Sequence, residues 1–204
     1  MKAGQQSPSK GRKFPAEPLT ASEARALIGA PSRRAPTGIR NRALMMLMYR
    51  TGLRISEALA LKPSDVNADR GTVRVLHGKN DRDRTVGIDD GALAVLQLWL
   101  ERRRLLGFRN GPLFCTLDGK PVSAGYVRDM LKRMARRAGI DKRVHPHCLR
   151  HTHAAELAAE GVPVNVIQQQ LGHMWLATTD IYLRHIAPAD VIAVGRNRPW
   201  AETP

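Results

Sequence analysis

The sequence has few cysteines, few aromatic residues and no long apolar run. Of its 204 residues two are cysteines, Cys115 and Cys148, too few for a disulfide framework and typical of a reducing compartment. The longest apolar run, Ala43–Met48, is far shorter than the ~18 residues of a membrane span, so no membrane partner is expected. Aromatic residues make up 4%, which argues against a single-strand binder that stacks bases. We expect a cytoplasmic protein.

The sequence is strongly basic. It holds 33 Lys and Arg residues against 18 Asp and Glu residues, a formal net charge of +15. An excess of this size in a chain this short points to a polyanion partner. Hydrophobic residues make up 43%, enough for a packed core. Double-stranded DNA, held through its phosphates, is the expected partner, and DNA binding would place the protein at the nucleoid.

The chain divides into a short tail and one domain. Residues 1–18 are basic, rich in Gly, Pro and Ser, and lack periodicity, which predicts a flexible tail. Order begins at Leu19, where Thr20 and Glu23 have the spacing of a helix capping box. We expect one compact domain over residues 19–204.

The periodicity predicts a mostly helical α+β domain with one small antiparallel sheet. A basic loop over residues 31–40 precedes the second helix. Two strands, linked by a polar turn over residues 77–83, interrupt the helices. Helices are expected at about 20–30, 40–49, 55–62, 90–106, 124–137, 147–160 and 164–171, near 178 and after 188, and strands at 72–76 and 84–88.

Six polar residues stand where the pattern of core positions does not explain them. Two of them, His147 and Arg150, are three residues apart on one expected helix and therefore share a face. The six are Arg54, Lys79, His147, Arg150, His173 and Tyr182.

This set of residue types suits cleavage of a phosphodiester. Arginines bind phosphate oxygens with two parallel hydrogen bonds and stay charged, so two of them can stabilise a pentacoordinate transition state without a metal. A tyrosine nucleophile, with a pKa of about 10, is ionised in roughly one molecule in a thousand at pH 7, a handicap of about 4 kcal/mol that nearby Arg and His groups can offset. A lysine on a hairpin is a reasonable acid for the leaving hydroxyl.

Four short motifs resemble those of tyrosine site-specific recombinases of the phage-integrase and Xer type. The segment Thr-Gly-Leu-Arg54-Ile-Ser-Glu57 resembles the first arginine motif of the family, and Gly78-Lys79 its hairpin lysine. The segment His147-Cys-Leu-Arg150-His151 resembles the H-x-x-R-H box. Leu171-Gly172-His173 followed by Thr178-Thr179-Asp180-Ile181-Tyr182 resembles the histidine and nucleophile segment. Each motif is short, but their order and spacing together are specific.

The resemblance implies a role for each residue. Arg54 and Arg150 would hold the scissile phosphate, and His173 would donate a further hydrogen bond to it. His147 would be the acid–base partner of Tyr182, and Lys79 the proton donor to the leaving 5′ hydroxyl. Tyr182 would form a 3′-phosphotyrosyl bond that conserves the energy of the broken linkage, so that no cofactor, metal or ATP is needed. Glu57 and His151 would support the pocket.

The resemblance also implies partners. Most members of the family carry an N-terminal domain that closes around DNA, whereas here only about 18 residues precede the catalytic domain. We therefore expect a catalytic domain without that clamping domain, either as a recombinase that consists of the catalytic domain alone or as a fragment of a longer protein, and a short segment after Tyr182. The family implies a homotetramer on two DNA sites, a monomer or weak dimer without DNA, and accessory DNA-bending proteins. Candidate contacts to the DNA backbone are Arg33, Arg34, Arg40, Arg42, Lys132, Arg133, Arg136 and Arg137.

Three alternatives stay open at this point. His147 and His151, four residues apart with His145 and Cys148 close by, have the spacing of a zinc pair, but the intervening glutamate of H-E-x-x-H and a well-spaced third ligand are missing. A type IB topoisomerase shares the Arg, Lys, His and Tyr chemistry and relaxes supercoils as a monomer. A DNA-binding relative that has lost its activity would keep the fold without the reaction.

Overall fold

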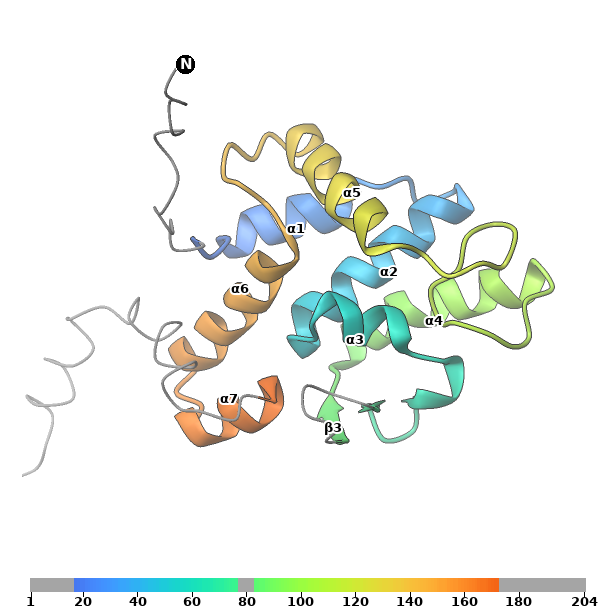
Figure 1. Ribbon diagram of the computed structural model, residues 1–204. Coiled ribbons are helices and arrows are strands. Elements are labelled where there is room, and N and C mark those ends of the chain that lie inside the picture. The colour runs from blue at the N-terminus through green and yellow to red at the C-terminus, as the bar shows by residue number, and fades with distance from the viewer. Residues whose placement is uncertain (1–16, 77–82, 173–204) are drawn as a thin grey trace, which may run out of the picture.

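The computed structural model describes residues 17–76 and 83–172 of the chain. In these ranges seven α-helices pack against one another, and a small sheet lies at one edge of the molecule (Figure 1). The expected fold class, mostly helical α+β with one small antiparallel sheet, is confirmed. The elements in chain order are α1 (Ala21–Gly29), α2 (Pro36–Thr51), α3 (Ile55–Ala60), the 3-10 turn η1 (Pro63–Asp65), β1 (Val66–Asn67), β2 (Thr72–Val75), β3 (Arg84–Gly87), α4 (Asp90–Leu105), α5 (Ala124–Arg137), α6 (Pro146–Ala159) and α7 (Val164–Leu171).

Helix α2 is the centre of the core. It packs against α1, α3, α4 and α6, and Leu44, Met45, Leu47 and Met48 on it are buried. A helix that is apolar on most of its faces has to be buried on most of its faces, which explains why four other helices cover it. The C-terminus of α2 is thereby fixed at the point where the chain turns toward α3.

A polar network holds that end of α2 against two neighbours. The Tyr49 hydroxyl donates to the Glu156 carboxylate of α6 at 2.5 Å, and Arg50 Nε donates to Asp89, the N-cap residue of α4, at 2.8 Å. Burial, together with the bond to Glu156, raises the pKa of Tyr49 to about 12, so the phenol stays protonated as the donor. The ends of α2, α4 and α6 are thus fixed to one another.

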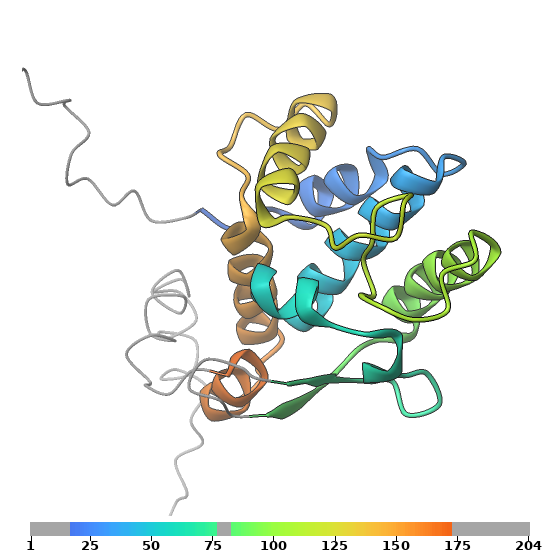
Figure 2. The same ribbon diagram turned by 45° about the vertical axis from the view of Figure 1, so that its right-hand side comes forward.

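The sheet has the order β1-β2-β3, and both pairs of strands are antiparallel. Val73 pairs with Val86 and Val75 with Arg84, so the two strands flank residues 77–82, where the sequence predicts a turn. Strand β3 also contacts α7, and Figure 2 shows the two elements side by side. The sheet therefore brings the base of the expected lysine hairpin next to the helix that ends just before His173.

Several expected helix ends are confirmed. Thr20 and Glu23 form the reciprocal capping box of α1, the Ser123 hydroxyl caps α5, and Gly139 follows α5 with a φ of 67°. Gly172 ends α7 in the left-handed conformation, with a φ of 64°. The expected short helix near residue 178 and the one after residue 188 lie outside the described residues.

At the level of elements, one prediction was wrong and one strand was missed. Helix α2 begins at Pro36, within the segment expected to be a basic loop up to Arg40, because proline at the first helical position needs no hydrogen-bond partner for its nitrogen. Strand β1 has two residues, too few to produce an alternating pattern.

Cys115 and Cys148 are buried free thiols.

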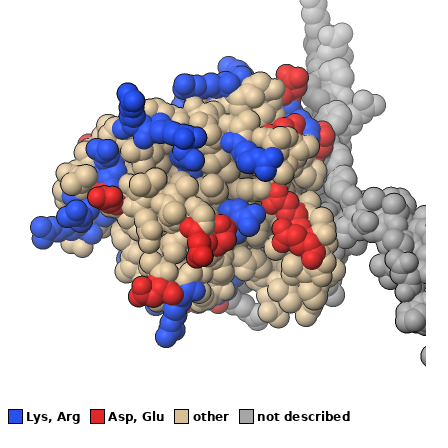
Figure 3. Space-filling view, turned by 180° about the vertical axis from the view of Figure 1, so that it is seen from behind, with Lys and Arg blue, Asp and Glu red and all other residues tan. Residues whose placement is uncertain are grey.

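The face seen in Figure 3 carries charges of both signs. Asp and Glu side chains lie among the Lys and Arg side chains on it (Figure 3), so that this face is not the uniformly positive surface that a polyanion favours. None of the helices in ranges 17–76 and 83–172 has the length and apolar character of a membrane span.

Candidate active site

The site is built around the sharp turn between α2 and α3. Gly52 ends α2 with a φ of 65°, a conformation that side chains other than glycine rarely adopt. A Cβ atom at this position would lie 2.6 Å from Leu171 Cδ2 of α7 and 2.7 Å from His153 Cδ2 of α6. Glycine is therefore needed twice, once for the turn and once for the close approach of α6 and α7.

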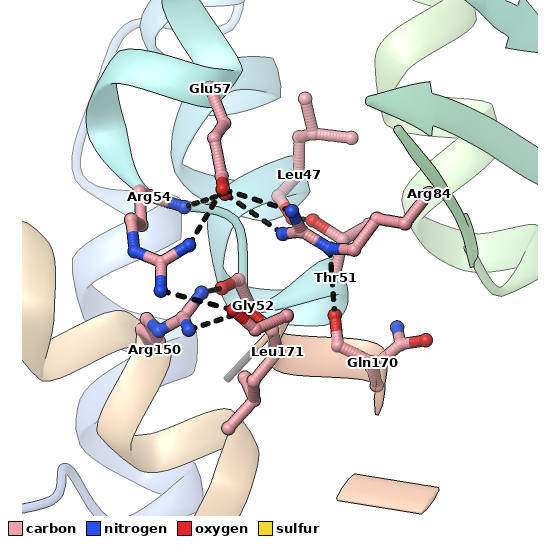
Figure 4. Close-up of polar contacts among 10 residues, drawn as sticks. Leu47, Thr51, Gly52, Arg54, Glu57, Arg84, Arg150, Gln170 and Leu171 are labelled. Carbon is pink, nitrogen blue, oxygen red and sulfur yellow. Dashed lines mark hydrogen bonds and ion pairs between the residues drawn. The ribbon is translucent and has the colours of Figure 1, made fainter. Parts of the chain in front are cut away.

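Arg150 lies where the turn, α6 and α7 meet. Its Nη1 donates to the Gly52 carbonyl at 2.5 Å and its Nη2 to the Leu171 carbonyl at 2.6 Å, and the residue is 1% exposed. A buried guanidinium is tolerated when it is hydrogen-bonded, and an arginine remains charged in proteins. The structure thus fixes a permanent positive charge at the junction of three elements (Figure 4).

Arg54 joins Arg150 from the other side of the turn. It is the N-cap residue of α3, and its Nη2 donates to the Gly172 carbonyl at 3.3 Å, while its Nη1 donates to Glu57 at 2.8 Å. The two arginines therefore donate to carbonyls of consecutive residues at the end of α7, and Figure 4 shows their guanidinium groups close together. From the sequence we expect both arginines at one site, and the structure brings them together there.

Glu57 is the buried counterion of this pair. It accepts from the Arg54 backbone nitrogen and side chain and from both terminal nitrogens of Arg84, all at 2.8–2.9 Å. Desolvation by burial raises its pKa, but the bonds and charges of Arg84 and Arg54 outweigh it and bring the pKa of Glu57 down to about 2. The carboxylate is ionised throughout the physiological range.

His147 reaches solvent on the first turn of α6. The protein atoms packed around its ring lower its pKa, and the positive charges of Arg150, Arg54 and Arg128 lower it further. A lowered pKa keeps the imidazole neutral near pH 7, the form that accepts a proton. His151, expected to support the pocket, is half-buried on the same helix.

Three of the six predicted residues lie outside the described ranges. They are Lys79, His173 and Tyr182. The structure describes their neighbours: Val75 pairs with Arg84 on the two strands that flank residues 77–82 in the sequence, and Gly172 precedes His173 and accepts from Arg54. Among residues 17–76 and 83–172, no group of three or more His, Cys, Asp or Glu side chains is placed to hold a metal ion.

The predicted phosphate contacts separate into buried and exposed residues. Arg40 is 3% exposed, and its guanidinium donates to Asn41, the Cys115 carbonyl and the Tyr126 hydroxyl. Its charge is used inside the protein to join α2 to α5, so Arg40 is corrected from a DNA contact to a structural residue. Arg42 is partly buried with its Nε unpaired, and desolvation lowers its pKa. The exposed ones are Arg33, Arg34, Lys132, Arg133, Arg136 and Arg137.

Two further residues of the site were not predicted. Arg84 lies on β3 on the same face as the buried Val86, and alternation along the strand was a usable signal, because an arginine facing inward requires a counterion. Arg128 of α5 is exposed and acts electrostatically on His147. Nothing in the sequence near Arg128 indicates that α5 and α6 bring the two side chains together.

Comparison with known proteins places the chain in a family. The model of the phage integrase family matches residues 17–187, and the chain belongs to this family. It is 41% identical over 184 residues to tyrosine recombinase XerD of Ralstonia nicotianae, with 88% of this chain and 59% of that protein covered. The chain thus spans about three fifths of the length of that relative.

Solved structures give the same result. The crystal structure of XerA recombinase matches 93% of this chain and 68% of its own, with 31% identity and a TM-score of 0.79. The XerH site-specific recombinase, solved with its palindromic difH substrate after cleavage, matches 90% of this chain and 54% of its own, with 27% identity and a TM-score of 0.75. The fold is that of the tyrosine recombinases.

Proposed function

We propose that this chain cuts and rejoins double-stranded DNA in site-specific recombination, with Tyr182 as the nucleophile. The observation that carries the proposal is the convergence of Arg54 and Arg150 on the end of α7, one residue before His173. Two permanent positive charges held by the backbone form a preorganised site for a phosphate. Membership of the phage integrase family and the similarity to XerH, which was solved with its substrate, support DNA as that phosphate's source.

The reaction is a transesterification in which bonds are exchanged one for one. The Tyr182 hydroxyl attacks the scissile phosphorus while His147 accepts the phenolic proton. The bond from phosphorus to the 5′ oxygen breaks, and Lys79 supplies the proton to that oxygen. Arg54, Arg150 and His173 stabilise the charge on the non-bridging oxygens. A 5′ hydroxyl from another strand then attacks the 3′-phosphotyrosyl bond and releases Tyr182.

Neutral His147 suits the role of proton acceptor. A histidine whose pKa is lowered by burial and further by neighbouring arginines is unprotonated at pH 7 and available as a base. The same arginines would favour the phenolate of a tyrosine brought beside them. Substrate binding and base activation would thus use the same charges.

The assembly and the DNA surface are part of the proposal. As the resemblance implies, four copies on two DNA sites would exchange strands in pairs, and without DNA the chain would be a monomer or weak dimer. The exposed basic residues of α5, Lys132, Arg133, Arg136 and Arg137, would contact the DNA backbone together with Arg33 and Arg34. Sedimentation of the chain with and without its DNA site measures the change in the number of copies.

Covalent capture tests the reaction. The purified chain is incubated with a pool of nicked duplexes whose sequence is randomised around the nick, so that the short strand released by cleavage diffuses away and the adduct persists. We expect an adduct that survives denaturation, and sequencing of its DNA identifies the site. The variant Tyr182→Phe should give no adduct. Absence of an adduct from the native chain on every duplex would contradict the proposal.

A plasmid carrying two copies of the recovered site separates the reaction from relaxation. Recombinant products are expected. Relaxation of supercoils without recombinant products would identify a topoisomerase instead.

A further inference from the structure

We propose that Arg84 is a positioning residue that holds Arg54 in place for phosphate binding. This inference rests on the proposed function, since it concerns the same site. The structure shows Arg84 in contact with both groups to which the Arg54 side chain donates, the Glu57 carboxylate and the end of α7 (Figure 4). Arg84 itself lies on β3, in an element separated from Arg54 by the whole β1–β2 segment.

The first shared group is the Glu57 carboxylate. Arg84 Nη1 donates to Oε1 and Nη2 to Oε2, each at 2.9 Å. Arg54 donates to the same two oxygens, from its Nη1 to Oε1 and from its backbone nitrogen to Oε2, each at 2.8 Å. A carboxylate bound by one fork of two parallel bonds has a fixed plane, so Arg84 sets the direction from which Glu57 accepts the Arg54 side chain.

The second shared group is the last turn of α7. Arg84 Nε donates to the Gln170 carbonyl at 3.4 Å. A Cβ atom on Gly172 would lie 2.9 Å from Arg84 Cζ, so glycine at this position lets the peptide lie directly against the guanidinium plane. The carbonyl of Gly172 is the one that accepts from Arg54. Arg84 therefore fixes the position of that acceptor as well.

Burial and charge favour a fixed arrangement. The side chains of Arg84 and Glu57 are 14% and 4% exposed, compared with 22% for Arg54. Arg54 and Arg84 carry two positive charges and share the single negative charge of Glu57. The three side chains together therefore keep a net charge of +1 for a ligand. We infer that Arg84 and Glu57 together neutralise each other and leave the charge of Arg54 for the phosphate.

The variant Arg84→Lys removes the fork and keeps the charge. A lysine makes a point contact and cannot reach both carboxylate oxygens and the Gln170 carbonyl in one plane. We expect the single-turnover rate of adduct formation to fall about 100-fold, the effect of a small misplacement of a group at the reacting centre. The DNA affinity and the midpoint of thermal unfolding should stay close to the native values.

A substrate with an uncharged methylphosphonate at the scissile position distinguishes positioning of Arg54 from general weakening of the fold. The methyl group removes the non-bridging negative charge that Arg54 compensates, so the orientation of Arg54 matters less to the rate. We expect the penalty of Arg84→Lys to shrink to a few-fold on this substrate, as should that of Arg54→Lys. An equal penalty on both substrates would overturn the proposal, because a weakened fold affects both alike.

A substrate with sulfur in place of the 5′ bridging oxygen tests the other way in which Arg84 could act. A thiolate leaves without a proton donor more readily than an alkoxide, since the thiol pKa is far lower. If Arg84 served Lys79 instead of Arg54, the penalty of Arg84→Lys would disappear on this substrate. We expect the penalty to persist for Arg84→Lys and to disappear for Lys79→Ala.

Matched variants complete the test. Arg74→Lys, on β2 of the same sheet, changes an ion pair with Asp65 of η1, and the Arg74 side chain is 58% exposed; this variant should leave the cleavage rate unchanged. Glu57→Gln should reproduce the effect of Arg84→Lys, and the double variant should lose little more than either single one, because the two residues act as one unit. Additive losses, or a native rate for Arg84→Lys, would contradict the proposal. A native chain that forms no adduct would instead refute the function on which the proposal rests.

Discussion

Arg54 and Arg150, which contact the end of α7, have surroundings opposite to those of the arginines on the outer face of α5. Arg150 is 1% exposed and bonded to two backbone carbonyls, whereas Arg136 and Arg137 project into solvent. Burial fixes the charge of an arginine and keeps water and salt away from it. The charge of an exposed arginine is screened by the surrounding salt solution. One cluster is therefore suited to stabilise a transition state, and the other to hold a polyanion loosely.

The largest effect is expected at the buried cluster. Arg150→Ala removes one preorganised donor and leaves the Gly52 and Leu171 carbonyls without it, so we expect the cleavage rate to fall about 1000-fold, or ~4 kcal/mol of transition-state stabilisation. The rate of adduct formation at saturating DNA measures it. Arg137→Ala is the matched control and should cleave at close to the native rate under saturation. Equal losses for the two variants would break the distinction between the clusters.

The buried side of the site should also respond to pH through His153. This residue lies against the Gly52 turn with its Nε2 unpaired, and burial lowers its pKa to about 4, below the ~6.5 of an unfolded histidine. Between pH 6.5 and pH 4 the unfolded chain therefore binds the extra proton, and stability present above pH 6.5 is lost as the pH falls, by about 3 kcal/mol from this residue.

The variant His153→Leu should lack that part of the pH dependence. Denaturant titrations at several pH values between 7 and 4.5 measure it. Glu57, whose pKa is about 2, loses its stabilising charge only below its unfolded value near pH 4.5 and does not disturb the comparison. A native slope in His153→Leu would show that the ring is not the group that titrates.

The exposed cluster should govern the salt dependence of DNA binding. If Lys132, Arg136 and Arg137 each contact a phosphate, replacing any of them by Gln should reduce the slope of log affinity against log salt by about 1. Fluorescence anisotropy over a series of salt concentrations gives the slope. The buried Arg40, replaced by Lys to keep its charge, should leave the slope unchanged. A slope that is the same in all variants would remove α5 from the DNA surface.

Arg128 belongs to neither cluster, because it is exposed and yet acts on the site. Its charge helps to lower the pKa of His147, so Arg128→Gln should raise that pKa and move the acidic limb of the cleavage profile to higher pH. Arg136→Gln should not move it. This is the smallest expected effect, measured as adduct formation against pH. An unmoved limb in Arg128→Gln would mean that His147 does not limit the reaction there.

The sequence predicted the elements better than their contacts. Periodicity and capping residues located α4, α5 and α7, because local patterns decide where such helices begin and end. The start of α2 was predicted four residues too late, since proline, which stands at its first position, occurs both in loops and at the start of helices. β1 was missed because two residues of strand depend on pairing with β2 and not on their own pattern.

The part of the site that lies within short sequence motifs could be predicted from the sequence. Arg54 and Arg150 were identified from their neighbours in the sequence, and Glu57 as a supporting residue. Arg40 was misassigned because nothing in the sequence shows that Asn41, Tyr126 and the Cys115 carbonyl enclose its guanidinium. Arg84 was missed for the same reason: its role depends on contacts between β3, α3 and α7 that only the folded chain brings together.

The most direct measurement is the identity of the residue that carries the DNA in the covalent adduct. The adduct formed by the native chain is digested with nuclease and protease, and the modified peptide is sequenced by mass spectrometry. We predict a nucleotide joined through its 3′ phosphate to Tyr182. A nucleotide on any other residue, or a 5′ linkage, would contradict the account of how Arg54 and Arg150 serve the reaction.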